Sequence, residues 1–127
     1  MIQFTKGTAN TFDVTLTEKT SITSPTFLFR FTNEGTNTQN TCIATDSSSY
    51  TRRYNRFTIT ESTTEDRANG TLTLAYAGFW KYEIYEQSDS SLVVSTQNKV
   101  EEGIMQLTDL TAANSYVEQS NGDTYVE

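Results

Sequence analysis

The feature of the sequence that most constrains its fold is a strict alternation of apolar and polar side chains in several short segments. The longest of these segments, residues 78–87, contains the only tryptophan of the chain, Trp80. One face of this segment carries Trp80, Tyr82 and Ile84, and the other carries Lys81, Glu83 and Tyr85. A period of two is typical of a β-strand with one buried face. Because a buried aromatic ring removes roughly 150–250 Å² from water, we expect this strand to supply the centre of the core.

Other segments with the same alternation follow along the whole chain, separated by turn residues. Residues 26–32 place Phe27, Phe29 and Phe31 on one face, with Arg30 and Leu28 on the opposite, wetter face. The expected strands span residues 2–5, 11–17, 26–32, 41–45, 54–61, 71–74, 78–87, 92–94 and 99–107. Within the last of these, we interpret Gly103 as a bulge glycine. Short strands without a convincing helix predict an all-β protein, either an immunoglobulin-like β-sandwich or, as the alternative, a jelly roll.

The length of 127 residues fits one domain, which we place at residues 1–109. Threonine makes up about one residue in five and favours half-exposed strands, while 12% of the residues are aromatic, more than a disordered chain contains. Residues 110–127 show no convincing period, and we expect an extended or disordered C-terminal arm. Tyr116 and Tyr125 of this arm are candidate contacts with a partner.

Charge and residue usage argue against several classes of function. The net charge of −7 disfavours nucleic acid and anionic membrane surfaces, which attract Lys and Arg. Without histidine, catalytic triads and common zinc sites lose their usual base or ligand, so we expect no enzyme, no cofactor and no metal. Cys42 is the single cysteine and is interpreted as a small strand residue, because no histidine can activate it. No apolar run of a signal peptide or membrane span occurs.

Two groups of residues are candidates for binding. Arg52, Arg53 and Arg56 place a third of the nine basic residues within five positions, although pairing with acidic residues on neighbouring strands is the simpler interpretation. The second group would stack on sugar rings if it is exposed, and ordinary surface tyrosines are the alternative. It consists of Tyr50, Tyr54, Tyr76 and Phe79.

Several packing segments, taken in order, resemble a family of small structural proteins of tailed bacteriophages. The segments are Lys6-Gly7, Phe12-Asp13-Val14-Thr15-Leu16-Thr17-Glu18-Lys19, Pro25 to Asn33, Arg53 to Ile59, Gly78 to Gln87 and Val100-Glu101-Glu102-Gly103-Ile104-Met105. This order is similar to that of auxiliary (decoration) capsid proteins of crAss-like phages and other phages of Bacteroidota. The resemblance covers about residues 2–108 and is carried by packing motifs, of which the Trp80 segment is the most distinctive.

The resemblance implies an immunoglobulin-like domain in a virion that is assembled in the cytoplasm of the host bacterium. The expected partners are the major capsid protein or other virion proteins, contacted by many copies in a symmetric assembly. The expected mechanism is adhesion and reinforcement, with avidity from many copies. A component of the neck, tail or head-fibre base, or a displayed module that binds glycans or the host, remains the alternative.

Overall fold

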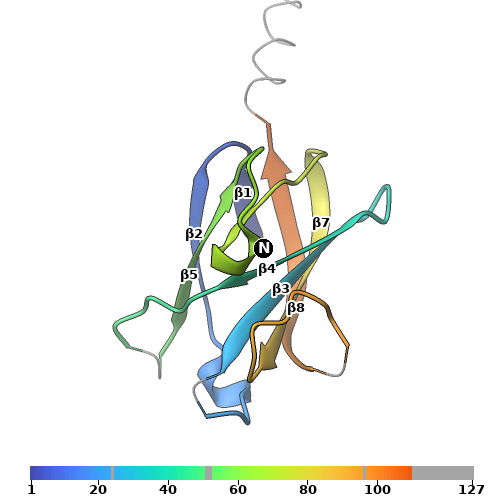
Figure 1. Ribbon diagram of the computed structural model, residues 1–127. Helices are drawn as coiled ribbons and strands as arrows, with labels where there is room; N and C mark the ends of the chain where they lie inside the picture. Colours follow the sequence, from blue (N-terminus) through green and yellow to red (C-terminus); the bar gives the residue numbers. More distant parts are fainter. Residues whose placement is uncertain (24, 51–52, 96, 110–127) are drawn as a thin grey trace, which may run out of the picture.

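The strands form two facing sheets in a computed structural model that describes residues 1–23, 25–50, 53–95 and 97–109. This confirms the all-β fold and the β-sandwich (Figure 1). Residues 110–127, and with them the predicted arm, lie outside the described residues. The strands are β1 (Ile2–Thr5), β2 (Ala9–Val14), β3 (Thr26–Asn33), β4 (Gln39–Ala44), β5 (Asn55–Glu61), β6 (Thr71–Leu72), β7 (Gly78–Gln87) and β8 (Asn98–Thr108), with short 3₁₀ turns η1 (Thr17–Lys19) and η2 (Arg67–Asn69).

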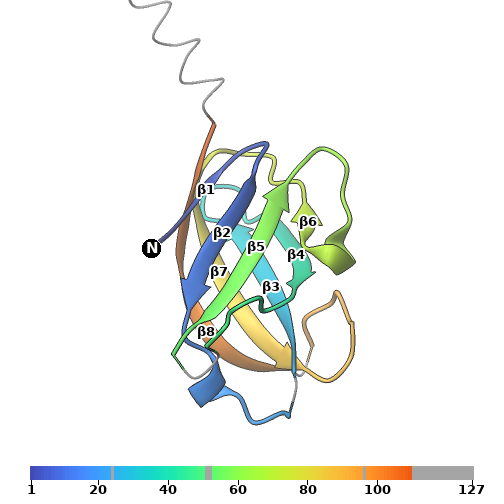
Figure 2. The same cartoon turned by 90° about the vertical axis from the view of Figure 1, so that its left-hand side faces the viewer.

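The order of the strands is that of an immunoglobulin-like sandwich and not that of a jelly roll. One sheet has the order β1-β8-β7-β3-β4, and the facing sheet has the order β2-β5-β6 (Figure 2). β1 pairs in parallel with the last strand, β8, while β7 pairs antiparallel with both β8 and β3. In an immunoglobulin-like sandwich one sheet has the strand order G-F-C, extended by C′ in variable-type domains, and the facing sheet contains B, E and D; β8-β7-β3-β4 and β2-β5-β6 follow these orders.

The core lies between the two sheets and is largely aromatic. Trp80 is completely buried at its centre, and its indole N–H donates to the carbonyl oxygen of Tyr76 at 2.9 Å. Phe29 and Phe57 meet edge to face across the sandwich, with ring centroids 5.0 Å apart. No disulfide joins the sheets within the described residues, and Cys42 is buried as a free thiol. Aromatic packing between the inner faces therefore holds the sheets together, as the alternation predicts.

Several details of the sequence prediction were wrong, among them the strand expected at 71–74, which spans only Thr71–Leu72. The strand expected at 11–17 begins at Ala9 and ends at Val14. Residues 92–94 are not a strand; Leu92 and Val94 pack on Leu28, which is therefore completely buried and not on a wet face. The bulge of β8 lies opposite Ile84 and Tyr85 and not at Gly103.

Gly103 has a different role, because a Cβ there would lie only 2.7 Å from the ring of Tyr82. The glycine leaves space for that ring, and any side chain at this position would have to displace it.

The two lateral sides of the sandwich are built differently. On the closed side, residues 65–72 pass beside the edges of β4 and β5, and η2 lies against β4. Gly70 has φ +77° there, and a Cβ would approach the carbonyl oxygens of Thr58 and Ile43 to 3.2 and 3.4 Å. On the open side, β1 and β2 are the edge strands of their sheets, and β2 pairs with β5 alone (Figure 2).

Candidate interaction surfaces

The predicted arginine patch is not assembled as one surface by the described residues. Arg56 lies on β5 and forms a two-pronged pair with Asp13 of β2, with Nε–Oδ1 at 2.8 Å and the second nitrogen–oxygen distance at 3.2 Å. Its guanidinium also lies over the ring of Tyr54, 5.2 Å from the centroid. The hydrogen bond from Arg56 lowers the pKa of Asp13 below its ordinary value. Arg56 is thus engaged within the molecule, as the simpler interpretation of the sequence predicts.

The other predicted contacts are placed as follows. Arg53 is exposed, and no described residue forms an ion pair with it. Arg52, Tyr116 and Tyr125 lie outside the described residues, so their role as partner contacts stays a prediction.

The aromatic residues proposed for sugar stacking do not form one platform. Tyr50, Tyr76 and Phe79 are 64%, 51% and 53% exposed, respectively. Tyr54 precedes β5 at the end of the sandwich where Val14 pairs with Asn55. Tyr76 and Phe79 lie at the opposite end, where Gly78 pairs with Leu107.

The outer face of the five-stranded sheet carries an ion network centred on Glu83. Its carboxylate lies 2.8 Å from the guanidinium of Arg30 on β3 and 3.1 Å from Lys99 Nζ on β8. Lys99 also pairs with Glu102 at 2.7 Å, and Lys81 lies 3.9 Å from both carboxylates. Burial opposes ionisation, but the hydrogen bonds from Arg30 and Lys99 hold the pKa of Glu83 below its ordinary value. The alternation predicts that these side chains share the outer faces of neighbouring strands, but not that they pair.

The same face is partly covered by the chain between β7 and β8. Leu92 and Val94 pack over Leu28, Ile43 and Tyr85 and form a small second core. Sequence reasoning missed this cluster. The apolar triplet Leu92-Val93-Val94 was the available signal, but it was interpreted as a strand.

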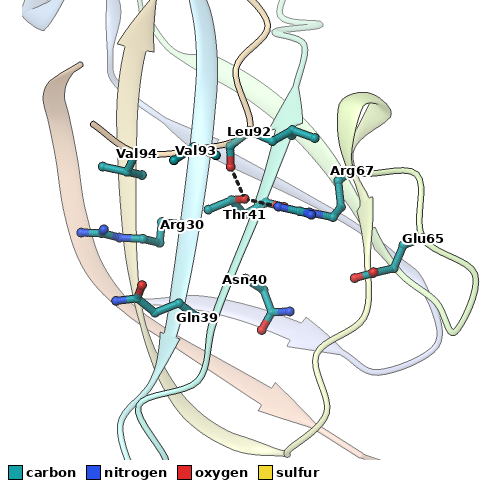
Figure 3. A pocket seen from close by; sticks show the side chains of 9 residues that line it. All are labelled: Arg30, Gln39, Asn40, Thr41, Glu65, Arg67, Leu92, Val93 and Val94. Atoms are coloured by element: carbon teal, nitrogen blue, oxygen red, sulfur yellow. Dashed lines mark hydrogen bonds between the residues drawn. The ribbon is translucent and has the colours of Figure 1, made fainter. Parts of the chain in front are cut away.

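A hollow of about 320 Å³ lies where this covering chain meets β4 and η2 (Figure 3). Arg67 crosses to β4 and donates to the carbonyl oxygen of Thr41 at 2.9 Å and to its hydroxyl at 2.6 Å. That hydroxyl donates to the carbonyl oxygen of Leu92 at 2.6 Å. Arg30 points away from Arg67, toward its partner Glu83. The buried Oδ1 of Asn40 has no hydrogen-bond partner among the described residues.

Arg67 thereby seals the edge of β4. Asn33 N–H donates to the Thr38 carbonyl oxygen at 2.9 Å, so these two residues are a hydrogen-bonded pair of the β3–β4 ladder. This pair determines which of the following residues of β4 bond to β3 and which do not. In an antiparallel pair, alternate residues turn their backbone groups away from the partner strand, and Thr41 is one of these in β4. Its outward carbonyl group accepts from the guanidinium, so this part of the edge is capped by a side chain.

Two fully or nearly buried carboxylates hold loops in place. Glu86 accepts hydrogen bonds from the backbone N–H groups of Ser21 and Ile22 and from Asn98, at 2.6–3.1 Å. Burial opposes its ionisation, but these donors hold the pKa of Glu86 below its ordinary value. The even spacing from Trp80 and Ile84 already places Glu86 on the inner face, which was the signal for a buried acid.

Glu61 has a similar position at the end of β5. It lies an even number of residues from Phe57 and Ile59, which also places it on the inner face. It accepts from Gly7 N–H at 2.7 Å and Leu74 N–H at 3.0 Å, and pairs with Lys6 at 3.3 Å. Glu61 thus ties the β1–β2 turn to the segment after β6.

The described residues offer little that catalysis commonly uses. They contain no group of three His, Cys, Asp or Glu side chains that could hold a metal ion. Burial raises the pKa of the Cys42 thiol to about 12, so the nucleophilic thiolate is scarce near neutral pH. Among these residues, no helix is both long enough and apolar enough to cross a membrane.

Comparison with known proteins adds one distant structural likeness. No family model matches the chain, and no curated protein matches it. A putative glycoside hydrolase from Bacteroides vulgatus ATCC 8482 is similar in structure, with a TM-score of 0.47 and 10% sequence identity. The matched region covers 86% of this chain but 16% of the hydrolase, so the chain spans only a small part of that protein. A likeness at this level carries no argument about function.

Proposed function

We propose that the chain is a non-enzymatic structural protein of a virion, which decorates or reinforces the capsid shell of a tailed bacteriophage by docking on the major capsid protein. The observation that supports a structural role is that the two buried acids bind loop backbone. Glu61 and Glu86 accept backbone N–H groups and hold loops onto the sandwich. Such a preformed domain loses little conformational entropy when it binds, which suits docking in many copies.

The assignment to a virion rests on the resemblance of the ordered packing segments, above all residues 78–87. It is tested by quantitative mass spectrometry of purified phage particles that carry this protein. A fixed ratio to the major capsid protein, with hundreds of copies per particle, supports decoration of the shell. Roughly a dozen copies, as one symmetric ring requires, would move the protein to the neck, tail or fibre base. Absence from the particle would overturn the virion proposal and leave a binding module.

Arg53 and the segment 110–127 are the proposed contacts with the capsid. Arg53 is exposed, and no described residue pairs with it, so reversing its charge changes the surface without breaking a described ion pair. The double variant Arg52→Glu/Arg53→Glu is expected to bind capsids from which this protein has been removed at least tenfold more weakly than the wild-type chain does. Arg56→Gln is the control, because Arg56 is already engaged by Asp13. Unchanged binding by the double variant would eliminate the arginines, and unchanged binding after deletion of 110–127 would eliminate the C-terminal segment.

A further inference from the structure

Along the whole length of β2, no described residue seals its edge on the open side. Glu61 N–H donates to the Thr8 carbonyl oxygen at 3.0 Å, so Thr8 and Glu61 are a hydrogen-bonded pair. From this pair onward, every second residue of β2 bonds to β5 and the residues between them do not. Ala9, Thr11 and Asp13 therefore turn their backbone N–H and C=O groups away from β5. No hydrogen bond from any other described residue meets these outward groups.

The side chains of this edge do not prevent another strand from approaching. Natural edge strands are commonly protected by proline, lysine, a bulge or an inward-pointing charge. β2 has the sequence Ala-Asn-Thr-Phe-Asp-Val and pairs with β5 in continuous register. Its only charged side chain, Asp13, points outward and is neutralised by Arg56. Phe12 and Val14 are only half-buried on the inner face, so apolar surface remains exposed beside the open backbone.

We propose that this edge pairs with the same edge of a second copy of the chain, antiparallel about a two-fold axis at Thr11. Thr11 of one copy lies opposite Thr11 of the other, and Ala9 lies opposite Asp13. The outward backbone groups of the three residues then face one another in register, and the two β2-β5-β6 sheets become one continuous sheet. A two-fold pairing of this kind is self-complementary, because each copy offers the same donors and acceptors.

The charged side chains of this edge are compatible with pairing to a second copy, because Asp13 is the only one in β2 and is already paired with Arg56. A chain with a net charge of −7 repels its own copies, so self-association requires a contact without facing like charges. In the proposed register, the carboxylate of Asp13 lies opposite the methyl group of Ala9 of the other copy and stays paired with Arg56 of its own copy. The inference deepens the proposed function, on which it rests, by naming a contact between neighbouring copies in a symmetric assembly.

Disulfide trapping tests the register in the full-length chain. Paired residues of this type have Cα atoms about 5.5 Å apart, within the range that a disulfide spans. Thr11→Cys is therefore expected to form a covalent dimer at least tenfold faster under mild oxidation than Thr58→Cys. Thr58 is the matched control, because it is also exposed but lies one strand away from the axis. The buried Cys42 does not compete. Equal rates for the two variants would overturn the proposed register.

Sedimentation equilibrium tests the association itself. Thr11→Lys places two like charges opposite each other at the axis and is expected to weaken dimerisation at least tenfold, whereas Thr58→Lys leaves it nearly unchanged. A wild-type chain that remains monomeric up to millimolar concentration would overturn the pairing. The copy number in the particle is measured independently, so the virion proposal stands or fails without this result.

Discussion

The closed and open sides of the sandwich show two ways of ending a β-sheet in one molecule. On the closed side, a guanidinium caps the carbonyl group of Thr41, and Gly70 lies where a Cβ would approach two further carbonyl oxygens to 3.2 and 3.4 Å. On the open side, β2 has outward backbone groups that no described residue meets. A capped edge contributes to the stability of the single chain, whereas an open edge is available for association.

The difference teaches that exposure alone does not identify a contact surface here. Arg67 and Thr41 are polar and partly exposed, but they are occupied by each other. Thr11 is an ordinary exposed threonine, but its backbone is free among the described residues. The partner available to each backbone group is therefore the better guide to function on this surface.

Core truncation is expected to give the largest difference between the two sides. Leu72 of β6 is completely buried on the closed side, and Leu72→Ala should lower the free energy of unfolding by about 2–5 kcal/mol. Val14 of β2 is half-buried on the open side, so Val14→Ala should cost about 1 kcal/mol or less. Urea denaturation of both variants at neutral pH and equal protein concentration measures the difference. Equal losses would show that the open edge is packed as tightly as the closed one.

The next largest effect is expected at two glycines with nearly the same backbone conformation. Gly70 and Gly7 have φ of +77° and +79°. A Cβ at Gly7 meets no atom within 4 Å, whereas one at Gly70 presses on two carbonyl oxygens. Gly7→Ala should therefore cost only the backbone strain, about 1 kcal/mol, and Gly70→Ala about 1–3 kcal/mol. Thermal unfolding followed by circular dichroism compares them, and a larger loss for Gly7→Ala would contradict the packing at Gly70.

The alternation of apolar residues was sufficient to predict the sandwich and its inner faces, because a period of two reports directly which side chains face together. Phe29 and Trp80 are buried as that pattern requires. The pattern could not predict the burial of Leu28, which depends on Leu92 and Val94 returning over the outer face from more than sixty residues away.

The candidate sites were less predictable than the fold, since each depends on pairs that are distant in sequence. Nothing near Arg56 in the sequence indicates Asp13 as its partner, and nothing near Thr41 indicates Arg67. The open edge of β2 depends on which strand lacks a neighbour, and this is a property of the topology.

A smaller difference is expected when one threonine on each edge is replaced by valine. Thr41→Val removes the hydroxyl that accepts from Arg67 and donates to Leu92, and each lost bond should cost about 0.5–1.5 kcal/mol. Thr11→Val removes only an exposed contact with the hydroxyl of Thr58 and should change the free energy of unfolding by about 0.5 kcal/mol or less. Urea midpoints decide this prediction, and a Thr11→Val loss as large as that of Thr41→Val would contradict it.

The smallest effect is expected for the change in unfolding free energy as the pH falls from neutral. This change should differ between variants of an interior carboxylate, Glu86, and of a carboxylate on the open edge, Asp13. The pKa of Glu86 is lowered from its ordinary value of 4.5, so its ionised form stabilises the folded chain. That contribution is fully present above pH 4.5 and is lost as the pH falls through the lower folded-state pKa. Unfolding free energies measured from pH 7 to pH 3 should therefore be flat at first and then decline.

Glu86→Gln should be less stable at neutral pH but decline less below pH 4.5. Asp13→Asn should nearly follow the wild-type curve, because Asp13 is exposed and solvent screens its pair with Arg56. If Asp13→Asn flattened the acid decline as much as Glu86→Gln, the open edge would be bound more tightly within the single chain than its geometry indicates.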